Sequence, residues 1–265
     1  MLTLQMIRIM DRLWKEAGYD FRMTPYRCIS VEHCVGLIEV VLNADTIANI
    51  QKNKGNAAIA AFKKGSLLAW IRDHNPQESD LNRAIEEFTL SCAGYCVATY
   101  ILGVADRHND NIMVKKNGQL FHIDFGFILG RDPRLRRPPI KITREMVDAM
   151  GGMDSENFYK FCSFVRTAFL HLRRHSNLIL NLFSLMVDAN VPEIALEPDK
   201  TVQKVQDKFK LELNDEQAAH YITEQVEQSV RSIMPVVVDQ LHKMTQVCLK
   251  LKFFVCFYLL GTYFN

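Results

Sequence analysis

The chain has 265 residues, of which 48% are hydrophobic and 23% charged, and its formal net charge is +2 at pH 7. These values are ordinary for a soluble globular protein with a substantial core, and the small net charge argues against nucleic-acid binding, which usually shows as a strongly basic domain. Seven cysteines without a C-x-x-C pair favour reduced thiols in the cytosol over a disulfide framework or a zinc site.

The first part of the chain predicts one helix and two strands. Residues 2–17 place their apolar side chains on one helical face, and Gly18 follows as a C-cap. Residues 21–31 and 35–42 are typical of strands, and the second segment is apolar enough to predict a buried one. The chain opens without a basic stretch or a cleavage site, so the sequence predicts no signal peptide.

Most of the remaining chain predicts helices. The pattern becomes helical from Ala44, and residues 81–102 are apolar enough on one side to predict a central helix, in which Gly94 indicates close packing. Three prolines in residues 130–141 exclude a helix or an inner strand. Apolar periodicity predicts further helices over residues 57–73, 144–150, 155–174, 177–188, 201–209, 215–229 and beyond 236.

The strongly apolar residues 247–264 do not predict a membrane span. Lys250 and Lys252 interrupt them, and the uninterrupted run from Phe253 holds only about a dozen residues, whereas a transmembrane helix needs roughly 20. Insertion at a membrane interface, packing against other domains and non-native sequence are the alternatives.

Two polar strings flank a predicted β-hairpin. D-R-H-N-D-N occupies residues 106–111, and H-I-D-F-G occupies residues 122–126. The Asn-Gly turn between them, flanked by apolar alternation, is the strongest short-range hairpin signal. Phosphoryl transfer from a nucleotide needs two oxygen-bearing side chains for magnesium and a nearby acid/base pair. The hairpin would hold suitable side chains at one end of its ladder: Asp106, His108, Asn111 and Asp124.

The spacing of these strings resembles that of kinases. An Asp, an Asn five residues later, a hairpin and then Asp-Phe-Gly match protein kinases, although those read H-R-D where this chain reads D-R-H. The inverted order, with S-C-A-G-Y-C at residues 91–96, resembles the phosphatidylinositol 3-/4-kinase superfamily. This resemblance implies an α+β, protein-kinase-like fold. Residues 1–42 would be a remnant of the small lobe and hinge, and residues 43–265 a large, mainly helical catalytic lobe with an activation loop at 124–142.

The resemblance also implies roles for the polar residues and implies ATP and Mg²⁺ as cofactors. Asp106 matches the catalytic aspartate, and His108 matches a histidine that acts as a base or steadies the transferring phosphoryl group. Asn111 and Asp124 match the magnesium ligands. The local alternatives are that Asp106 caps a turn, that His108 is merely solvated and that Asn111 starts the hairpin. Arg107 is expected to hold the loop by hydrogen bonds.

The nucleotide and headgroup sites follow from the same resemblance. Glu39 and Val41 match the hinge, whose backbone groups meet the adenine edge, and the pocket around adenine matches Ile38, Tyr26, Met113 and Ile123. Packing in the core explains these apolar residues about equally well. The activation loop, expected to choose the lipid headgroup, carries the basic residues Arg131, Arg134, Arg136, Arg137 and Lys141. Guanidinium groups suit phosphates, and a solvated charged face is the alternative.

The resemblance changes class along the chain. Up to Gly126 the chain resembles class I phosphoinositide 3-kinases of the beta or delta type, through residues 1–5, 45–51 and 84–90. Beyond Gly126 it resembles class III, the vacuolar protein-sorting type, through residues 128–133 and 176–206. The mixture indicates a composite chain or a divergent member. The chain also starts after the family's phosphate loop and ATP-binding lysine, and Ala105 replaces the usual glycine before the catalytic aspartate.

The resulting hypothesis is a lipid kinase lobe. It would transfer the γ-phosphate of ATP to the 3-hydroxyl of phosphatidylinositol, or of its phosphorylated forms, as a cytoplasmic protein that is peripheral on endosomal or plasma membranes. A regulatory or scaffold subunit is expected as a partner, and nucleic acid is not. The alternative is a catalytically silent regulatory or binding fragment. The related serine/threonine kinases are disfavoured because the helices after residue 143 match lipid kinases.

Overall fold

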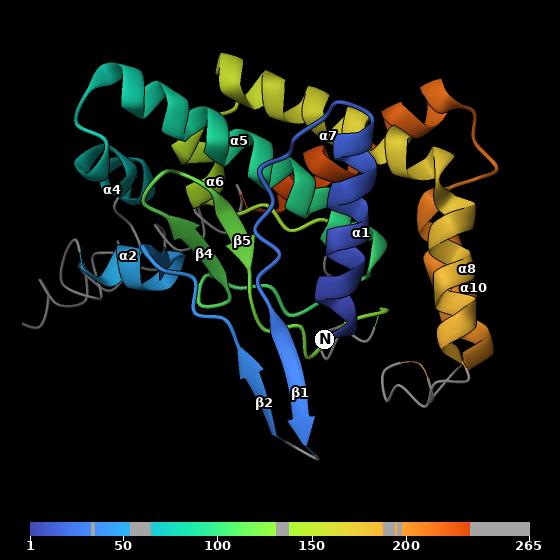
Figure 1. The fold of residues 1–265 in the computed structure, drawn as a ribbon. Helices are drawn as coiled ribbons and strands as arrows, with labels where there is room; N and C mark the ends of the chain where they lie inside the picture. The colour runs from blue at the N-terminus through green and yellow to red at the C-terminus, as the bar shows by residue number, and fades with distance from the viewer. Residues whose placement is uncertain (33–34, 54–64, 131–137, 188–193, 195–197, 234–265) are drawn as a thin grey trace, which may run out of the picture.

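The computed structural model describes the chain except for residues 33–34, 54–64, 131–137, 188–193, 195–197 and 234–265. Most of the described chain is helical, and the strands lie along one side of the helical body (Figure 1). This architecture confirms the predicted α+β class. Within the described ranges, no helix is long and apolar enough to cross a bilayer.

The helices largely confirm the sequence prediction. Residues 57–64, which were predicted to be helical, and the apolar tail lie outside the described residues. They are α1 (Leu2–Glu16), α2 (Ile47–Asn53), α4 (Ser66–His74), α5 (Glu78–Ile101), α6 (Arg144–Ala149), α7 (Glu156–Arg174), α8 (Ser176–Met186) and α10 (Pro198–Phe209). A further helix covers residues 215–233. The strands are β1 (Cys28–Glu32), β2 (Val35–Ile38), β3 (Ala44–Thr46), β4 (Ile112–Lys115) and β5 (Leu120–His122).

α1 packs into the helical body through its apolar face. Ile7, Met10 and Trp14 are fully buried, and burying a large apolar side chain stabilises a fold by roughly 2 kcal/mol. The indole N–H of Trp14 donates to the carbonyl of Ala168 in α7 at 3.0 Å. The predicted division of the chain at residue 42 stays a prediction, and α1, which precedes it, packs against α5 and α7.

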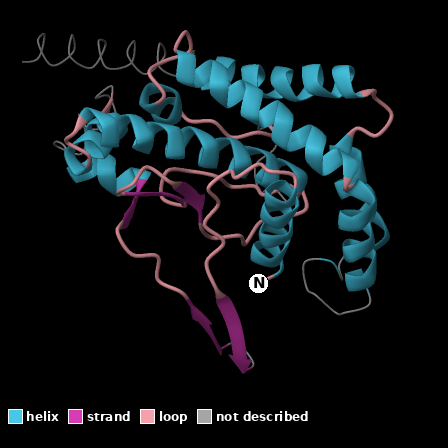
Figure 2. Cartoon of the chain, turned by 45° about the horizontal axis from the view of Figure 1, so that its top comes forward, coloured by secondary structure: helices cyan, strands magenta, loops and turns pink. Residues whose placement is uncertain are grey.

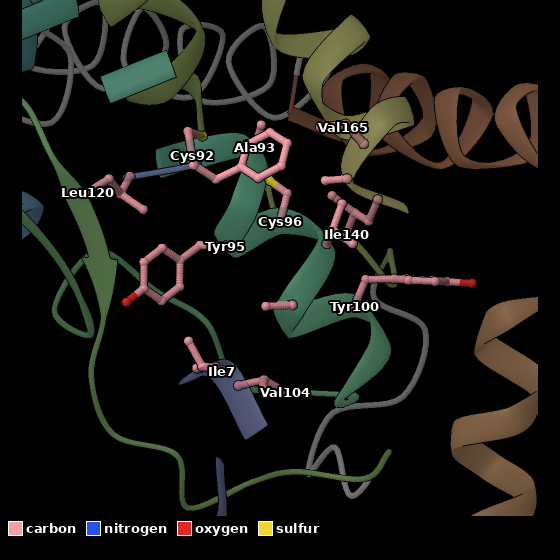
Figure 3. Close-up of a cluster of buried hydrophobic side chains, with 14 of the residues drawn as sticks. Ile7, Cys92, Ala93, Tyr95, Cys96, Tyr100, Val104, Leu120, Ile140 and Val165 are labelled. Carbon is pink, nitrogen blue, oxygen red and sulfur yellow. The ribbon is translucent and has the colours of Figure 1, made fainter. Parts of the chain in front are cut away.

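α5 is the central helix, as predicted. Its buried residues meet Ile7 from α1, Leu120 from β5 and Val165 from α7 (Figure 3). Gly94 lets the Phe21–Met23 segment pack closely on α5, because a Cβ at this position would lie 2.6 Å from the Met23 sulfur and 2.9 Å from the Phe21 Cβ. The prediction of close packing at Gly94 is therefore confirmed.

The predicted hairpin is present and forms the middle and one edge of a three-stranded antiparallel sheet in the order β3-β4-β5. Ile112 lies opposite His122, and Val114 lies opposite Leu120. At the turn, the amide of Gly118 donates to the carbonyl of Lys115 at 2.8 Å. The sheet packs on α5 through β5, so the hairpin is held against the core along its length.

Gly118→Ala is expected to destabilise the fold by about 3 kcal/mol or more. Gly118 has a φ of +95°, which costs an L-residue roughly 1–2 kcal/mol, and an added Cβ would lie 1.9 Å from the carbonyl oxygen of Ala84 in α5. Gly18→Ala is the matched control, because Gly18 has a φ of +86° and no atom within 4 Å of an added Cβ. Urea unfolding gives the free energy of unfolding of both variants, and the difference between their losses measures the cost of the clash. Equal losses of stability would contradict the close approach of hairpin and helix.

The prediction of a buried strand at residues 35–42 is wrong. Only Val35–Ile38 form a strand, and Leu37 and Ile38 are 63% and 67% exposed. β2 pairs with β1 alone among the described strands, and the pair projects from the helical body (Figure 2). A two-stranded sheet supplies no second layer to cover an apolar face, so apolar composition did not lead to burial here.

Two further predictions near the N-terminus need correction. Residues 21–27 form no strand, although Phe21 and Met23 are buried against α5. The helix predicted from Ala44 begins only at Ile47, because Ala44–Thr46 pair with β4 as a strand. The hydroxyl of Thr46 then accepts the amide of Asn49 at 3.1 Å, as an N-cap does, and this starts α2.

Candidate active site

The two polar strings lie side by side at one end of the hairpin. The amide of Ile123 donates to the carbonyl of Asn111 at 3.0 Å, which extends the β4–β5 ladder by one pair. Farther along, the amide of Ala105 donates to the carbonyl of Phe127 at 2.8 Å. Ala105 is not among the described residues with positive φ, so its side chain costs no backbone strain. The hairpin thus brings both strings together, as its sequence predicts.

Arg107 is the main link between the strings. Its guanidinium donates to the carbonyls of Ala105 at 3.0 Å and Ile123 at 2.7 Å, and also to the carbonyl of Asp124. The residue is 5% exposed, and burial lowers its pKa to about 10, so it stays charged at neutral pH. The prediction that Arg107 holds the loop by hydrogen bonds is confirmed.

The side chain of Asn111 cross-links the loop of residues 106–111 by hydrogen bonds to its backbone. Its side-chain amide donates to the carbonyl of Asp106 at 2.8 Å, and its Oδ1 accepts the amide of His108 at 3.0 Å. Asn111 is only 3% exposed, so these bonds are largely shielded from water. The structure therefore shows the hairpin-start role, whereas the magnesium role remains a prediction.

His108 lies between two carboxylates. Its Nε2 is 4.0 Å from Oδ2 of Asp106, and its Nδ1 is 3.6 Å from Oδ2 of Asp110. The His108 side chain is 46% exposed and that of Asp106 is 23% exposed, so a substrate hydroxyl can reach both. Asp106 and Asp124 have φ values of 51° and 56°, in a left-handed region that is uncommon for residues other than glycine. Backbone strain of this kind often occurs at functional sites.

Asn111 and Asp124 fit the predicted magnesium role. Asp124 is exposed, and its Oδ1 accepts the amide of Gly126 at 3.3 Å; Asn111 Oδ1 has a second lone pair beyond the one that accepts His108. Among the described residues, no group of three or more His, Cys, Asp or Glu could hold a metal. Two oxygen ligands suit a magnesium ion that shares a nucleotide's phosphates and keeps some water.

The predicted adenine residues fall into three groups. A hollow of about 380 Å³ is lined by residues that include Tyr26, Glu39, Val41 and Lys115. Met113 and Ile123 are partly buried against the core, on the hairpin and at its end. Ile38 is 67% exposed on β2 and is not among the residues that line the hollow. The structure therefore brings the two hinge residues and Tyr26 together.

The predicted headgroup residues are mostly outside the described ranges, which exclude Arg131, Arg134, Arg136 and Arg137. Lys141 lines a hollow of about 280 Å³ together with Asp106 and Lys208, which belongs to α10. The ammonium of Lys208 lies 5.0 Å from the ring centroid of Tyr100, and burial lowers the pKa of Lys208. Sequence reasoning missed Lys208, because only the tertiary fold brings α10 to the catalytic loop.

Sequence reasoning also missed His122 and Tyr95. The two rings are buried and stack at 5.3 Å with an angle of 10° between their planes. Burial and the nearby Arg107 lower the pKa of His122 to about 3, so the imidazole is neutral at physiological pH. The position of His122 two residues before Asp124 was a signal, but its burial became visible only in the fold.

Comparison with known families decides the assignment. The family model described as "Phosphatidylinositol 3- and 4-kinase" matches residues 1–196. The chain belongs to this family. The predicted resemblance is therefore confirmed at the level of the family, and the fold is that of a kinase-like catalytic domain. The class I and class III assignments and the composite origin remain predictions.

Two curated relatives are similar to this phosphatidylinositol 3-/4-kinase family member over most of its length. Phosphatidylinositol 3-kinase 1 of Dictyostelium discoideum is 46% identical over 223 residues, which cover 82% of this chain and 14% of that protein. Phosphatidylinositol 3-kinase pik3 of Schizosaccharomyces pombe is 41% identical over 253 residues, which cover 92% of this chain and 30% of that protein. The chain thus spans less than a third of either relative.

Proposed function

We propose that the chain is the catalytic lobe of a phosphatidylinositol 3-kinase, which transfers the γ-phosphate of ATP to the 3-hydroxyl of phosphatidylinositol. Family membership and two relatives named phosphatidylinositol 3-kinase support the reaction class. The geometric support is Arg107, whose hydrogen bonds hold the loop with Asp106 and His108 beside Asp124. A surface hairpin without a function would not need these loops to be tied together by a buried cation.

In the proposed reaction, Asp106 and His108 handle the proton of the attacking hydroxyl. A hydroxyl becomes a competent nucleophile when a group within hydrogen-bond reach accepts its proton as the new P–O bond forms. Asp106 and Asp110 flank the imidazole of His108, so the proposed base lies beside the proposed catalytic aspartate. Asn111 and Asp124 hold Mg²⁺, which neutralises charge on the phosphates when bound.

The hollow at Tyr26, Glu39 and Val41 is the proposed place of the adenine base. An adenine site needs apolar walls and a few backbone polar groups, and this hollow offers a phenol ring, a valine side chain and the backbone of residues 39–42. Met113 and Ile123, the other predicted adenine residues on the hairpin and at its end, are partly buried against the core and do not line this hollow.

The proposed substrate is unphosphorylated phosphatidylinositol, because residues 128–133 resemble the short, proline-containing loop of class III. The basic residues of the loop, including Lys141, would contact the headgroup and would also accept phosphorylated forms. The protein would act peripherally on endosomal or plasma membranes, with a regulatory or scaffold subunit.

Radiolabel transfer onto a panel of headgroups tests this function. Purified protein with Mg²⁺ and γ-labelled ATP is expected to label phosphatidylinositol severalfold more than its bisphosphate, and chemical analysis should locate the label at the 3-position. Asp154→Asn is a control that should keep the activity, because Asp154 is exposed in the turn before α7. A preference for the bisphosphate would overturn the class III assignment.

Nucleotide binding separates the proposal from a silent regulatory fragment. The protein is expected to bind ATP more tightly with Mg²⁺ than with a chelator, because Asn111 and Asp124 act on the nucleotide through the metal. No magnesium-dependent binding of ATP would favour the silent fragment. Label on protein and not on lipid would favour the related protein kinases.

A further inference from the structure

Two helices donate hydrogen bonds to three successive carbonyl groups beside the adenine hollow. Arg8 of α1 donates through Nη2 to the carbonyls of Tyr26 at 3.0 Å and Pro25 at 3.3 Å. The hydroxyl of Tyr95 in α5 donates to the carbonyl of Thr24 at 3.1 Å. Residues 21–27 lie in no strand, so these carbonyl groups have no ladder partner. The Thr24 carbonyl also accepts the amide of Tyr26 at 2.9 Å.

The segment held in this way connects the hollow to the hairpin. Thr24, Pro25 and Tyr26 line the hollow, and the ring of Tyr26 packs edge-on against Phe121 of β5 with centroids 6.2 Å apart. Tyr95 itself stacks on His122, the residue after Phe121. The Thr24–Tyr26 backbone and the strand that leads to Asp124 therefore share one support, the buried ring of Tyr95.

We propose that Arg8 and Tyr95 are positioning residues for the nucleotide, which fix Tyr26 as a wall of the adenine hollow without touching the ligand. This inference rests on the proposed function, since it assumes that the hollow takes the base. Neither Arg8 nor Tyr95 is among the residues that line the hollow, and Tyr95 is fully buried. Without these hydrogen bonds, Tyr26 would be held less firmly in the free protein, and the entropy of ordering it upon binding would weaken the affinity.

A purely structural role for Tyr95 makes a different prediction. Losing a buried hydroxyl would then lower stability in the same way anywhere along α5, with no effect on nucleotide binding. Tyr100 provides this comparison within the same helix, because its hydroxyl lies 3.2 Å from that of Tyr221 and makes no hydrogen bond to the Thr24–Tyr26 segment. Both tyrosines are almost completely buried, so Tyr→Phe removes a comparable group at each.

Adenosine and MgATP affinities of Tyr95→Phe and Tyr100→Phe test the inference. Tyr95→Phe is expected to lower the affinities for adenosine and MgATP by the same factor of about threefold to tenfold, which is the effect of one net hydrogen bond. Tyr100→Phe should bind both ligands as the wild type does. Thermal unfolding of the two variants is measured in parallel, and similar losses of stability would show that instability does not explain the difference in binding.

Arg8→Gln gives an independent second variant. It removes the hydrogen bonds to the carbonyls of Pro25 and Tyr26 and should also lower the affinity for adenosine by about threefold to tenfold. Arg12→Gln is its control on α1, because the Arg12 side chain is 81% exposed and its contact at 3.7 Å with Glu16 is a surface ion pair.

The outcomes separate this inference from the function on which it rests. If the wild type binds neither adenosine nor MgATP, the proposed function fails and the inference fails with it. If the wild type binds both ligands but Tyr95→Phe and Arg8→Gln match it, only the positioning role is overturned. Equal weakening by Tyr100→Phe or Arg12→Gln would also overturn it, because the effect would then be general.

Discussion

Replacing Asp124 by asparagine is expected to lower kcat for lipid phosphorylation by about a thousandfold, because a charged group positioned on the reacting phosphates is worth several kcal/mol. Asparagine keeps the size of the side chain and tolerates the left-handed backbone at Asp124, where φ is 56°. The fold should therefore survive the change. Steady-state rates across a magnesium titration measure the effect, and half-maximal activity should require more Mg²⁺ than in the wild type.

Asp154→Asn again serves as the control, since it removes the same charge at an exposed position before α7. The magnesium role of Asp124 would be wrong if Asp124→Asn kept a kcat within about threefold of the wild type, which is less than 1 kcal/mol. It would also be wrong if the magnesium dependence did not change.

Arg107→Lys is expected to reduce both activity and stability. A lysine keeps the charge but cannot donate in the three directions of a guanidinium, so at least one of the carbonyls of Ala105, Ile123 and Asp124 loses its donor. Hydrogen bonds to charged groups contribute roughly 1.5–3 kcal/mol each, so a loss of about 2–4 kcal/mol is expected in urea unfolding. The rate should fall by at least about tenfold at a temperature where the variant is folded, because the two loops are no longer held together.

Arg173→Lys is the matched control for Arg107. Arg173 is 8% exposed and donates to the carbonyls of Phe209 and Lys210 and to Asp215, far from the hairpin in sequence. This variant should lose a similar free energy of unfolding and keep the kcat of the wild type when folded. If both variants lost activity in proportion to stability, Arg107 would have no specific role in holding the active site.

Local signals in the sequence were sufficient for several elements. The Asn-Gly turn and the apolar alternation around it predicted β4 and β5, and the helical periodicity of α1 and α5 predicted their buried faces. Such signals depend on residues a few positions apart, and turn chemistry acts over the same range. The loop-holding role of Arg107 was also expected from its position in D-R-H.

The failures all involve contacts between distant residues. Val35–Ile38 have the composition of a buried strand but are exposed, because burial needs a second layer that no local pattern reveals. Residues 21–27 have a strand-like pattern, yet their carbonyls pair with Arg8 and Tyr95 from two helices. Ala44–Thr46 joined β4 as a strand, whereas the helix began three residues later than predicted.

By itself, the sequence determined the hairpin, the main helices and the family, since each depends on short spacings or on motifs along the chain. Only the tertiary structure decided which groups support the site: the bonds from Arg107 to Ile123 and Asp124, the stacking of His122 on Tyr95, and the hollow that Lys208 and Asp106 line together. These contacts join residues that are 16 or more positions apart. Their partners become neighbours only when helices and strands pack, so no local pattern could specify them.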